Sequence, residues 1–291
     1  MFKIYYELTK PKVVALILFT ALIGMLLAPS EGAFPVQAVV FGLIGIGFGS
    51  AAGAAFNHII DESIDRKMQR TKNRPLPTNA LPRKNATIFA FSLAILSTTI
   101  LLVFVNQITA WLTLISMIGY AVIYTIYLKR TTPQNIIWGG AAGAMPPVLG
   151  WTAVTGSLHT EALLLFLIIF VWTPPHFWAL AIKRREEYKK VDIPMLPVTH
   201  GVEFTKEQVL LYTVMLLAVS LFPFITRMSG LLYLSAAVIL GVVFVYHAWR
   251  LHQEPSDKNA MKAFGFSIFY LSALFLFLLI DHYIRFIIAL F

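Results

Sequence analysis

Long apolar stretches, separated by short polar ones, run along almost the whole chain. A helix needs about 20 apolar residues to cross the hydrocarbon of a bilayer, and most of these stretches are near that length. They predict nine membrane-spanning helices, and therefore an all-α, polytopic membrane protein with a single domain over residues 1–291. The predicted helices cover roughly residues 11–29, 36–58, 86–105, 109–128, 135–154, 161–182, 208–226, 230–249 and 264–290.

Two of these stretches differ from the rest in their small residues and breakers. The second carries glycines and alanines throughout, and such residues let helix backbones approach closely inside a membrane, so we expect it inside the bundle. The fifth is interrupted repeatedly, which a membrane tolerates where a helix lines a cavity or is covered by neighbours. Its breakers are Gly139, Gly140, Gly143, Pro146 and Pro147.

Composition supports a membrane protein and argues against a nucleic-acid partner. Of 291 residues, 58% are hydrophobic and 13% charged, and the mean hydropathy is +0.75, which excludes an ordinary soluble domain. The net charge is +9, but nine spans place every Lys and Arg except Arg227 and Arg285 on the side of the N-terminus. Because cytoplasmic loops are enriched in these residues, the N-terminus is predicted to be cytoplasmic.

The N-terminal residues and the lack of cysteine bear on the expected cellular location and on the kinds of site. Without cysteine there is no disulfide framework and no thiolate metal site. The N-terminal residues lack the features of an organelle transit peptide, so a prokaryotic plasma membrane is the expected location. Lys3, Lys10 and Lys12 are interpreted as cytoplasmic anchors, and Pro11 is expected to open the first helix.

The segment from Asn57 to Pro77 has the highest density of chemistry-bearing residues. Asn57, Asp61 and Asp65 are four residues apart, so on a helix they share one face. Two carboxylates and an amide are hard oxygen ligands suited to Mg²⁺, which fills its other positions with water and phosphate oxygens. The row is therefore a candidate diphosphate site.

Three arginines follow this row at the same interval, Arg66, Arg70 and Arg74. Guanidinium groups pair with phosphate oxygens, so metal ligands and phosphate ligands occur together. A simpler interpretation is a solvated acidic helix end followed by positive-inside anchors. We favour the diphosphate site because the amide, the two carboxylates, the arginines and the closing RPLP occur in one segment.

A second concentration of polar residues follows the sixth apolar stretch. His176 lies after Pro174 and Pro175 within that stretch, and an ionisable side chain at that depth is a functional candidate. The loop from 183 to 206 is either a solvated charge run or a partner of the first loop, 59–85. Its carboxylates Glu186, Glu187 and Asp192 are candidate metal ligands, and the aromatic residues near His176 are Trp172, Phe177 and Trp178.

The motif that runs N-x-x-x-D-x-x-x-D and then R-x-x-x-R-P-L-P, with YAVIYTIYLKR closing the fourth helix, resembles the UbiA superfamily of intramembrane prenyltransferases. The resemblance covers essentially the whole chain. It implies a nine-helix bundle whose active site opens to the cytoplasm. The family's second aspartate-rich motif is missing here, which, with LTKPK and GAMPPVLGW, resembles the branch whose acceptor is protohaem IX (haem B).

This resemblance implies a farnesyl transfer from farnesyl diphosphate to a haem vinyl group, giving haem O. Mg²⁺ would bridge the diphosphate to Asn57, Asp61 and Asp65, and His176 would orient haem, bind its iron or handle a proton. A haem A synthase or a terminal oxidase is an implied assembly partner. The residues implied to offset the diphosphate charge are Arg66, Arg70, Arg74, Lys129 and Arg130, and Tyr124 joins the aromatic residues near the haem or isoprenoid.

Two other functions fit parts of the pattern. A UbiA-type enzyme acting on an aromatic or quinone precursor would use the same cation chemistry, although the missing second motif argues against it. A transporter of divalent cations or anions would also place carboxylates in broken membrane helices. Membrane lipid is a partner in every case, and no nucleic-acid module is visible.

Overall fold

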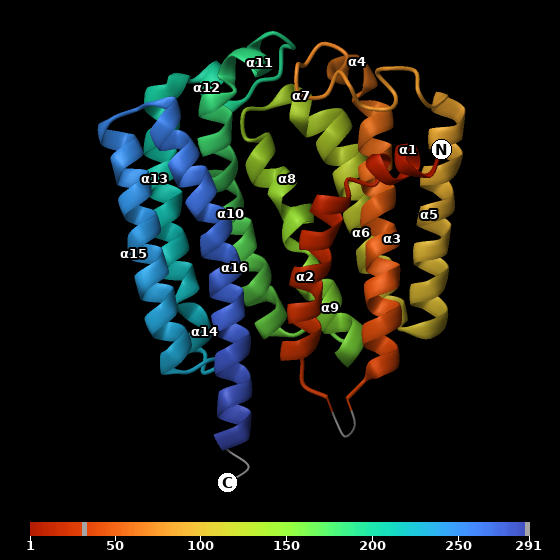
Figure 1. The fold of residues 1–291 in the computed structure, drawn as a ribbon. Coiled ribbons are helices and arrows are strands. Elements are labelled where there is room, and N and C mark those ends of the chain that lie inside the picture. Colours follow the sequence, from red (N-terminus) through yellow and green to blue (C-terminus); the bar gives the residue numbers. More distant parts are fainter. Residues whose placement is uncertain (31–33, 289–291) are drawn as a thin grey trace. The chain divides into compact units, whose positions relative to one another are not determined.

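The structure is a computed structural model that describes residues 1–30 and 34–288 (Figure 1). In these ranges all regular secondary structure is helical, which confirms the all-α prediction. The chain divides into two compact units. Unit 1 comprises residues 1–131, 145–162 and 190–193, and unit 2 comprises residues 132–144, 163–189 and 194–291.

Unit 1 contains the N-terminal helices. Its central member is α3, which packs against α2, α5, α6, α9 and the π-helix η1. This arrangement confirms that the glycine-rich second stretch lies inside its bundle. The elements are α1 (Phe2–Leu8), α2 (Pro11–Leu27), α3 (Val36–Ile60), α4 (Glu62–Asp65), α5 (Arg83–Phe104), α6 (Gln107–Ile118), η1 (Gly119–Leu128), α7 (Lys129–Thr131) and α9 (Pro146–Thr155).

Unit 2 contains the C-terminal helices. It also contains α10 from residue 163 onward, while the first three residues of α10 belong to unit 1. Within unit 2, α15 packs against α13 and α16. Its elements are α8 (Asn135–Ala144), α10 (Thr160–Lys183), α11 (Arg185–Lys189), α12 (Leu196–Thr199), α13 (Gly201–Ser220), α14 (Phe222–Ile225), α15 (Leu231–Gln253) and α16 (Asp257–Ile288).

Among residues 1–30 and 34–288, seven helical segments are long and apolar enough to cross a membrane, and α1 with α2 makes an eighth if this pair, bent by 56°, is one span. The chain is therefore a multi-pass membrane protein, but nine full spans are not confirmed. The difference lies in the fifth predicted helix, which is two helices of 10 residues each, α8 and α9. Each is about 15 Å long, half the hydrocarbon thickness. Pro146 and Pro147 lack the N–H groups that would continue α8.

Glycine allows α2 and α9 to approach until their backbones touch. A Cβ at Gly24 would lie 2.1 Å from the carbonyl oxygen of Pro147, and one at Gly150 would lie 1.9 Å from that of Ala21. On α3, a Cβ at Gly45 would overlap the Leu101 side chain at 2.5 Å. These contacts hold α2 against α9 and α5 against α3, the helix whose end carries Asn57.

Candidate functional site

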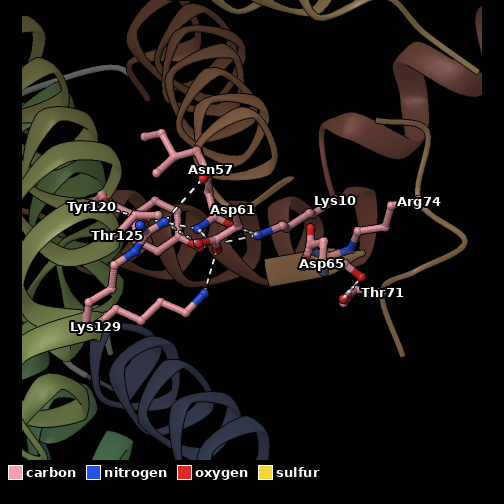
Figure 2. Close-up of polar contacts among 11 residues, drawn as sticks. Lys10, Asn57, Asp61, Asp65, Thr71, Arg74, Tyr120, Thr125 and Lys129 are labelled. Carbon is pink, nitrogen blue, oxygen red and sulfur yellow. Dashed lines mark hydrogen bonds and ion pairs between the residues drawn. The ribbon is translucent and has the colours of Figure 1, made fainter. Parts of the chain in front are cut away.

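The end of α3 carries a buried row of oxygen ligands, shown in Figure 2. Asn57, Asp61 and Asp65 are only 4%, 2% and 3% exposed. Although α3 ends at Ile60, the Asp61 N–H donates to Asn57 O at 2.9 Å and the Asp65 N–H to Asp61 O at 2.8 Å. These i to i+4 bonds preserve the helical interval across the break. The Asn57 amide also donates to Asp61 Oδ2 at 2.9 Å, so the predicted row begins as expected.

Cationic side chains of unit 1 pair with both carboxylates. Lys129 Nζ lies 2.6 Å from Asp61 Oδ2, and Arg130 lies 4.0 Å from Asp61 Oδ1. Arg74 donates to Asp65 Oδ2 at 2.7 Å. Two carboxylates therefore face three cations, and this excess of positive charge favours an anionic ligand.

Lys10 also reaches the cluster, which its interpretation as a cytoplasmic anchor missed. Its Nζ donates to Asn57 Oδ1 and lies 3.5 Å from the Tyr120 hydroxyl, and it sits 5.9 Å from the centre of the Tyr120 ring. The backbone of Lys10 is left-handed, with φ of 50°, between α1 and α2. Non-glycine residues adopt this conformation at a cost and mostly where the surroundings require it. The fold thus directs this side chain inward.

The π-helix η1 positions polar side chains beside Asn57. Thr125 is fully buried in η1; its hydroxyl accepts from the Asn57 amide at 3.1 Å and donates to the Tyr120 carbonyl, five residues earlier, at 2.8 Å. The wider turn of a π-helix changes which side chains share a face, and such segments are frequent at functional sites. Tyr120 and Thr125 were not predicted, because hydrophobic patterning does not reveal a π-helix.

The predicted arginine row is only partly present at the cluster. After Asp65 the chain runs through turns rather than a helix, so the interval of four no longer places side chains on one face. Arg66 pairs with Glu62 at 2.8 Å, bonds Asn79 at 3.0 Å and is half exposed. Arg70 is exposed. Arg74 pairs with Asp65 of the row.

The oxygen atoms in the row fit a divalent cation. Asp61 Oδ1 is buried and accepts no hydrogen bond, although a buried carboxylate oxygen normally has a partner. Within the described parts of the chain, no three His, Asp or Glu side chains are grouped to hold a metal alone. A Mg²⁺ ion here would use Asn57, Asp61 and Asp65 together with oxygens of its ligand, as this cation usually does.

Unit 2 holds a second cluster, around His176 on α10. The ring of His176 stacks between those of Trp172 and Phe264, at centroid distances of 4.1 and 4.6 Å. Its Nδ1 lies 2.6 Å from the Ser267 hydroxyl, and the Trp172 indole donates to the Ser267 carbonyl at 2.8 Å. The α10 helix continues through Pro174 and Pro175. This cluster is aromatic and contains no carboxylate.

The other predicted aromatic residues are Phe177, Trp178 and Tyr124, and they differ in burial and in packing partners. Trp178 is 2% exposed and packs edge-on against Tyr212 at 5.2 Å, whereas Phe177 is half-buried. Tyr124, in unit 1, stacks on Tyr120 at 5.7 Å.

The three loop carboxylates are divided between the two units. Asp192 is exposed in unit 1, while Glu186 and Glu187 lie on α11 in unit 2. Glu186 is 3.9 Å from Arg185, and Glu187 Oε2 is buried without a hydrogen-bond partner. The role of these carboxylates in metal binding stays a prediction.

Solved structures with the same fold include UbiA enzymes. The structure described as digeranylgeranylglyceryl phosphate synthase has a TM-score of 0.82 and 23% identity, covering 97% of this chain and 98% of that one. A UbiA homologue from Archaeoglobus fulgidus, bound to DMAPP and Mg²⁺, has a TM-score of 0.65 and 16% identity, covering 94% and 99%. At these identities the likeness establishes the fold alone.

Sequence relatives are much closer. A protoheme IX farnesyltransferase from Thioalkalivibrio sulfidiphilus is 62% identical over 98% of this chain and 94% of its own length. One from Nitrosococcus oceani is 60% identical over 96% and 93%. The UbiA prenyltransferase family profile matches residues 17–278. The chain therefore belongs to the UbiA prenyltransferase family.

Proposed function

We propose that this chain transfers the farnesyl group of farnesyl diphosphate to a vinyl group of protohaem IX, giving haem O. The observation that carries this proposal is the 62% identity, over 98% of the chain, to a protoheme IX farnesyltransferase. The buried oxygen row in unit 1, with its surplus of paired cations, supplies the chemistry that such a reaction needs. An acceptor of the aromatic or quinone-precursor class would require a different specificity from that of these relatives.

The diphosphate binds at the end of α3. Lys129, Arg130 and Arg74 lie beside the two carboxylates, and Lys10 reaches the same amide from another direction. When the C–O bond of the donor breaks, negative charge accumulates on the leaving diphosphate. Fixed cations in a site shielded from water stabilise that charge more than water does.

Asn57, Asp61 and Asp65 would hold a Mg²⁺ ion together with oxygens of the diphosphate. Bound Mg²⁺ supplies Lewis-acid stabilisation of the diphosphate oxygens. Lys129 and Arg74 now pair with Asp61 and Asp65, and we expect them to exchange these carboxylates for phosphate oxygens when the donor binds. The two cations then have an anionic partner both before and after binding. The metal would take their place beside the carboxylates, so no buried charge is left unpaired.

The donor yields an allylic farnesyl cation and diphosphate. The terminal carbon of the haem vinyl group then attacks C1 of this cation, which forms the new C–C bond and moves the positive charge to the vinyl carbon next to the porphyrin. Water adds there and releases a proton, giving a hydroxyethylfarnesyl side chain and balancing atoms and charge. The aromatic surroundings of His176 suit a flat porphyrin, and its imidazole is the proposed residue for orienting haem, ligating iron or accepting the proton.

The setting of the reaction is part of the proposal. Nine membrane crossings with a cytoplasmic N-terminus, in a plasma membrane, place the end of α3 at the cytoplasmic side. The distribution of Lys and Arg along the chain supports this orientation. Cysteine scanning in the naturally cysteine-free chain, at Lys84 and at Arg227, should give labelling from opposite sides of the membrane.

The decisive experiment uses the purified chain in lipid nanodiscs with haem B, farnesyl diphosphate and Mg²⁺. Mass analysis of the extracted haems should show the hydroxyethylfarnesyl product, together with one diphosphate released per haem converted. Product formation should stop on chelation of divalent metal and return with added Mg²⁺. Unchanged haem alongside a prenylated aromatic acid would reject the proposed acceptor. Movement of metal or anions without diphosphate release would indicate the transporter.

A further inference from the structure

Unit 1 has an open apolar groove apart from the polar row. It has a volume of about 740 Å³ and is bordered by α1, α2, α3 and α5. This volume lies within the range of roughly 300–1,000 Å³ that is usual for small-ligand sites. The residues that form its walls include Tyr5 and Tyr6 of α1, Leu18 of α2, Gly47 and Phe48 of α3, and Phe89 of α5.

The groove exists because one side chain is missing and one helix is bent. Gly47 has no side chain, and a Cβ there would make only ordinary contact with Leu18, at 3.5 Å. The 56° bend between α1 and α2 lets α1 lie across the helix ends, where the ring of Tyr5 packs on that of Phe89 at 4.9 Å. The groove therefore lies between α3, α5 and the bent pair of α1 and α2, and it is open on its outer side.

We propose that this groove binds an acyl chain of an anionic membrane phospholipid. The segments that form it are among those apolar and long enough to cross a bilayer, so the groove faces hydrocarbon rather than water. Its one non-aromatic polar residue, Thr9, already donates its hydroxyl to the Tyr6 carbonyl at 2.7 Å. The walls therefore offer a lipid chain dispersion contacts and offer water few partners.

Exposed lysines on α1 and at the first turns of α2 and α5, helices that border the groove, favour a negatively charged headgroup. Lys3 on α1, Lys12 at the start of α2 and Lys84 at the start of α5 are exposed. In the described residues none of these three lysines belongs to an ion pair, whereas the neighbouring Arg83 pairs with Glu62. Basic residues beside a gap between membrane helices bind the phosphate of anionic lipids.

The position of the groove argues against the farnesyl chain as its occupant. Ala51 lines the groove, and Asn57 begins the diphosphate row six residues later on the same helix. Six residues turn an α-helix by about 600°, which leaves the two side chains about 120° apart. A donor whose diphosphate lies at Asn57 would have to pass around α3 to reach this groove.

A photoreactive phosphatidylglycerol with a diazirine in its acyl chain tests the assignment in nanodiscs. Mapped cross-links should concentrate on α1, Phe48 and Phe89, and exceed by about fivefold those on the lipid-exposed α6 residues Trp111 and Ile115. Excess farnesyl diphosphate should leave this labelling unchanged. Equal labelling of the groove and α6 would mean ordinary annular lipid, and displacement by farnesyl diphosphate would mean the donor chain. Either result overturns the proposal.

Two variants test the acyl-chain site and the headgroup preference separately. Gly47→Phe should fill the groove and abolish most of its labelling, while Ile115→Phe should not change it. The triple variant Lys3→Gln, Lys12→Gln, Lys84→Gln should bring labelling by phosphatidylglycerol down to that by phosphatidylcholine. If the preference for phosphatidylglycerol survives this change, the anionic assignment is wrong. The wild-type comparison of groove and α6 decides the acyl-chain site even if a variant does not fold.

Discussion

The two clusters of chemistry-bearing residues are built on opposite principles. In unit 1, the row at Asn57, Asp61 and Asp65 is crowded with charge, and its carboxylates are paired with Lys129, Arg130 and Arg74. In unit 2, His176 lies between the rings of Trp172 and Phe264, and its ring nitrogen bonds a serine hydroxyl.

Charge that is paired in the absence of ligand can change partners when an anion and a metal arrive. Stacked rings cannot bind an anion in this way, but they complement a flat apolar surface. The comparison therefore bears on a prediction: the polar row of unit 1 suits an ionised donor, and the aromatic cluster of unit 2 suits a flat acceptor. Four substitutions, taken in order of expected effect, test this division.

Asp61→Asn should have the largest effect. It removes the carboxylate of the Lys129 pair and a proposed metal ligand, and we expect haem O formation to fall by about a thousandfold. The rate is measured by chromatography and mass analysis of extracted haems. Glu62→Gln is the matched control, because Glu62 is the adjacent acid but pairs with Arg66 and Arg83. Near-normal turnover of Asp61→Asn in folded protein would remove the row from the mechanism.

His176→Phe should affect the acceptor selectively. Phenylalanine keeps an aromatic ring between Trp172 and Phe264 but cannot bond Ser267, ligate iron or accept a proton. We expect kcat/KM for haem B to fall by about a hundredfold, while KM for farnesyl diphosphate changes little.

His247→Phe is the matched control for this substitution, since His247 packs on Phe266 elsewhere in unit 2. Equal changes in the kinetic constants of both substrates would contradict the division between the two units. They would make His176 a residue of general structural importance.

Lys10→Met should affect the donor. It keeps most of the length of the side chain but removes the charge-assisted hydrogen bond at Asn57, and such bonds contribute about 1.5–3 kcal/mol. We expect KM for farnesyl diphosphate to rise by about tenfold to thirtyfold. Lys12→Met, two residues away and exposed, should retain the wild-type KM. A rise in the haem KM instead would place Lys10 with the acceptor.

Thr125→Val should have the smallest effect. It removes the hydroxyl that accepts from the Asn57 amide and donates to the Tyr120 carbonyl, while the shape of the side chain is kept. One lost hydrogen bond contributes about 1 kcal/mol, so we expect about a fivefold fall in kcat. Thr131→Val removes a similar bond, to the Tyr127 carbonyl, on the exposed surface. The two variants should differ; if they are equally active, η1 does not position the row.

The sequence by itself determined the helical class, most of the candidate spans and the members of the oxygen row. These depend on local properties, namely the length of apolar stretches and a spacing of four residues, which backbone bonds preserve through Asp61. The inward position of α3 was also predictable, because many small residues on one membrane helix allow its neighbours to pack closely around it. The roles of the arginines, of His176 and of the second loop remain predictions.

Only the tertiary structure decided which cations meet the carboxylates. Lys10 lies 47 residues from Asn57 in sequence, and Thr125 and Lys129 each lie 68 residues from their partners. Their contacts depend on a left-handed residue between α1 and α2 and on a π-helix, neither of which has a hydrophobic period of its own. Arg66, although next to Asp65, turns away to Glu62 and Asn79. Pairing between distant charges follows from how helices pack, and helix packing is a property of the whole set of neighbours rather than of any one segment.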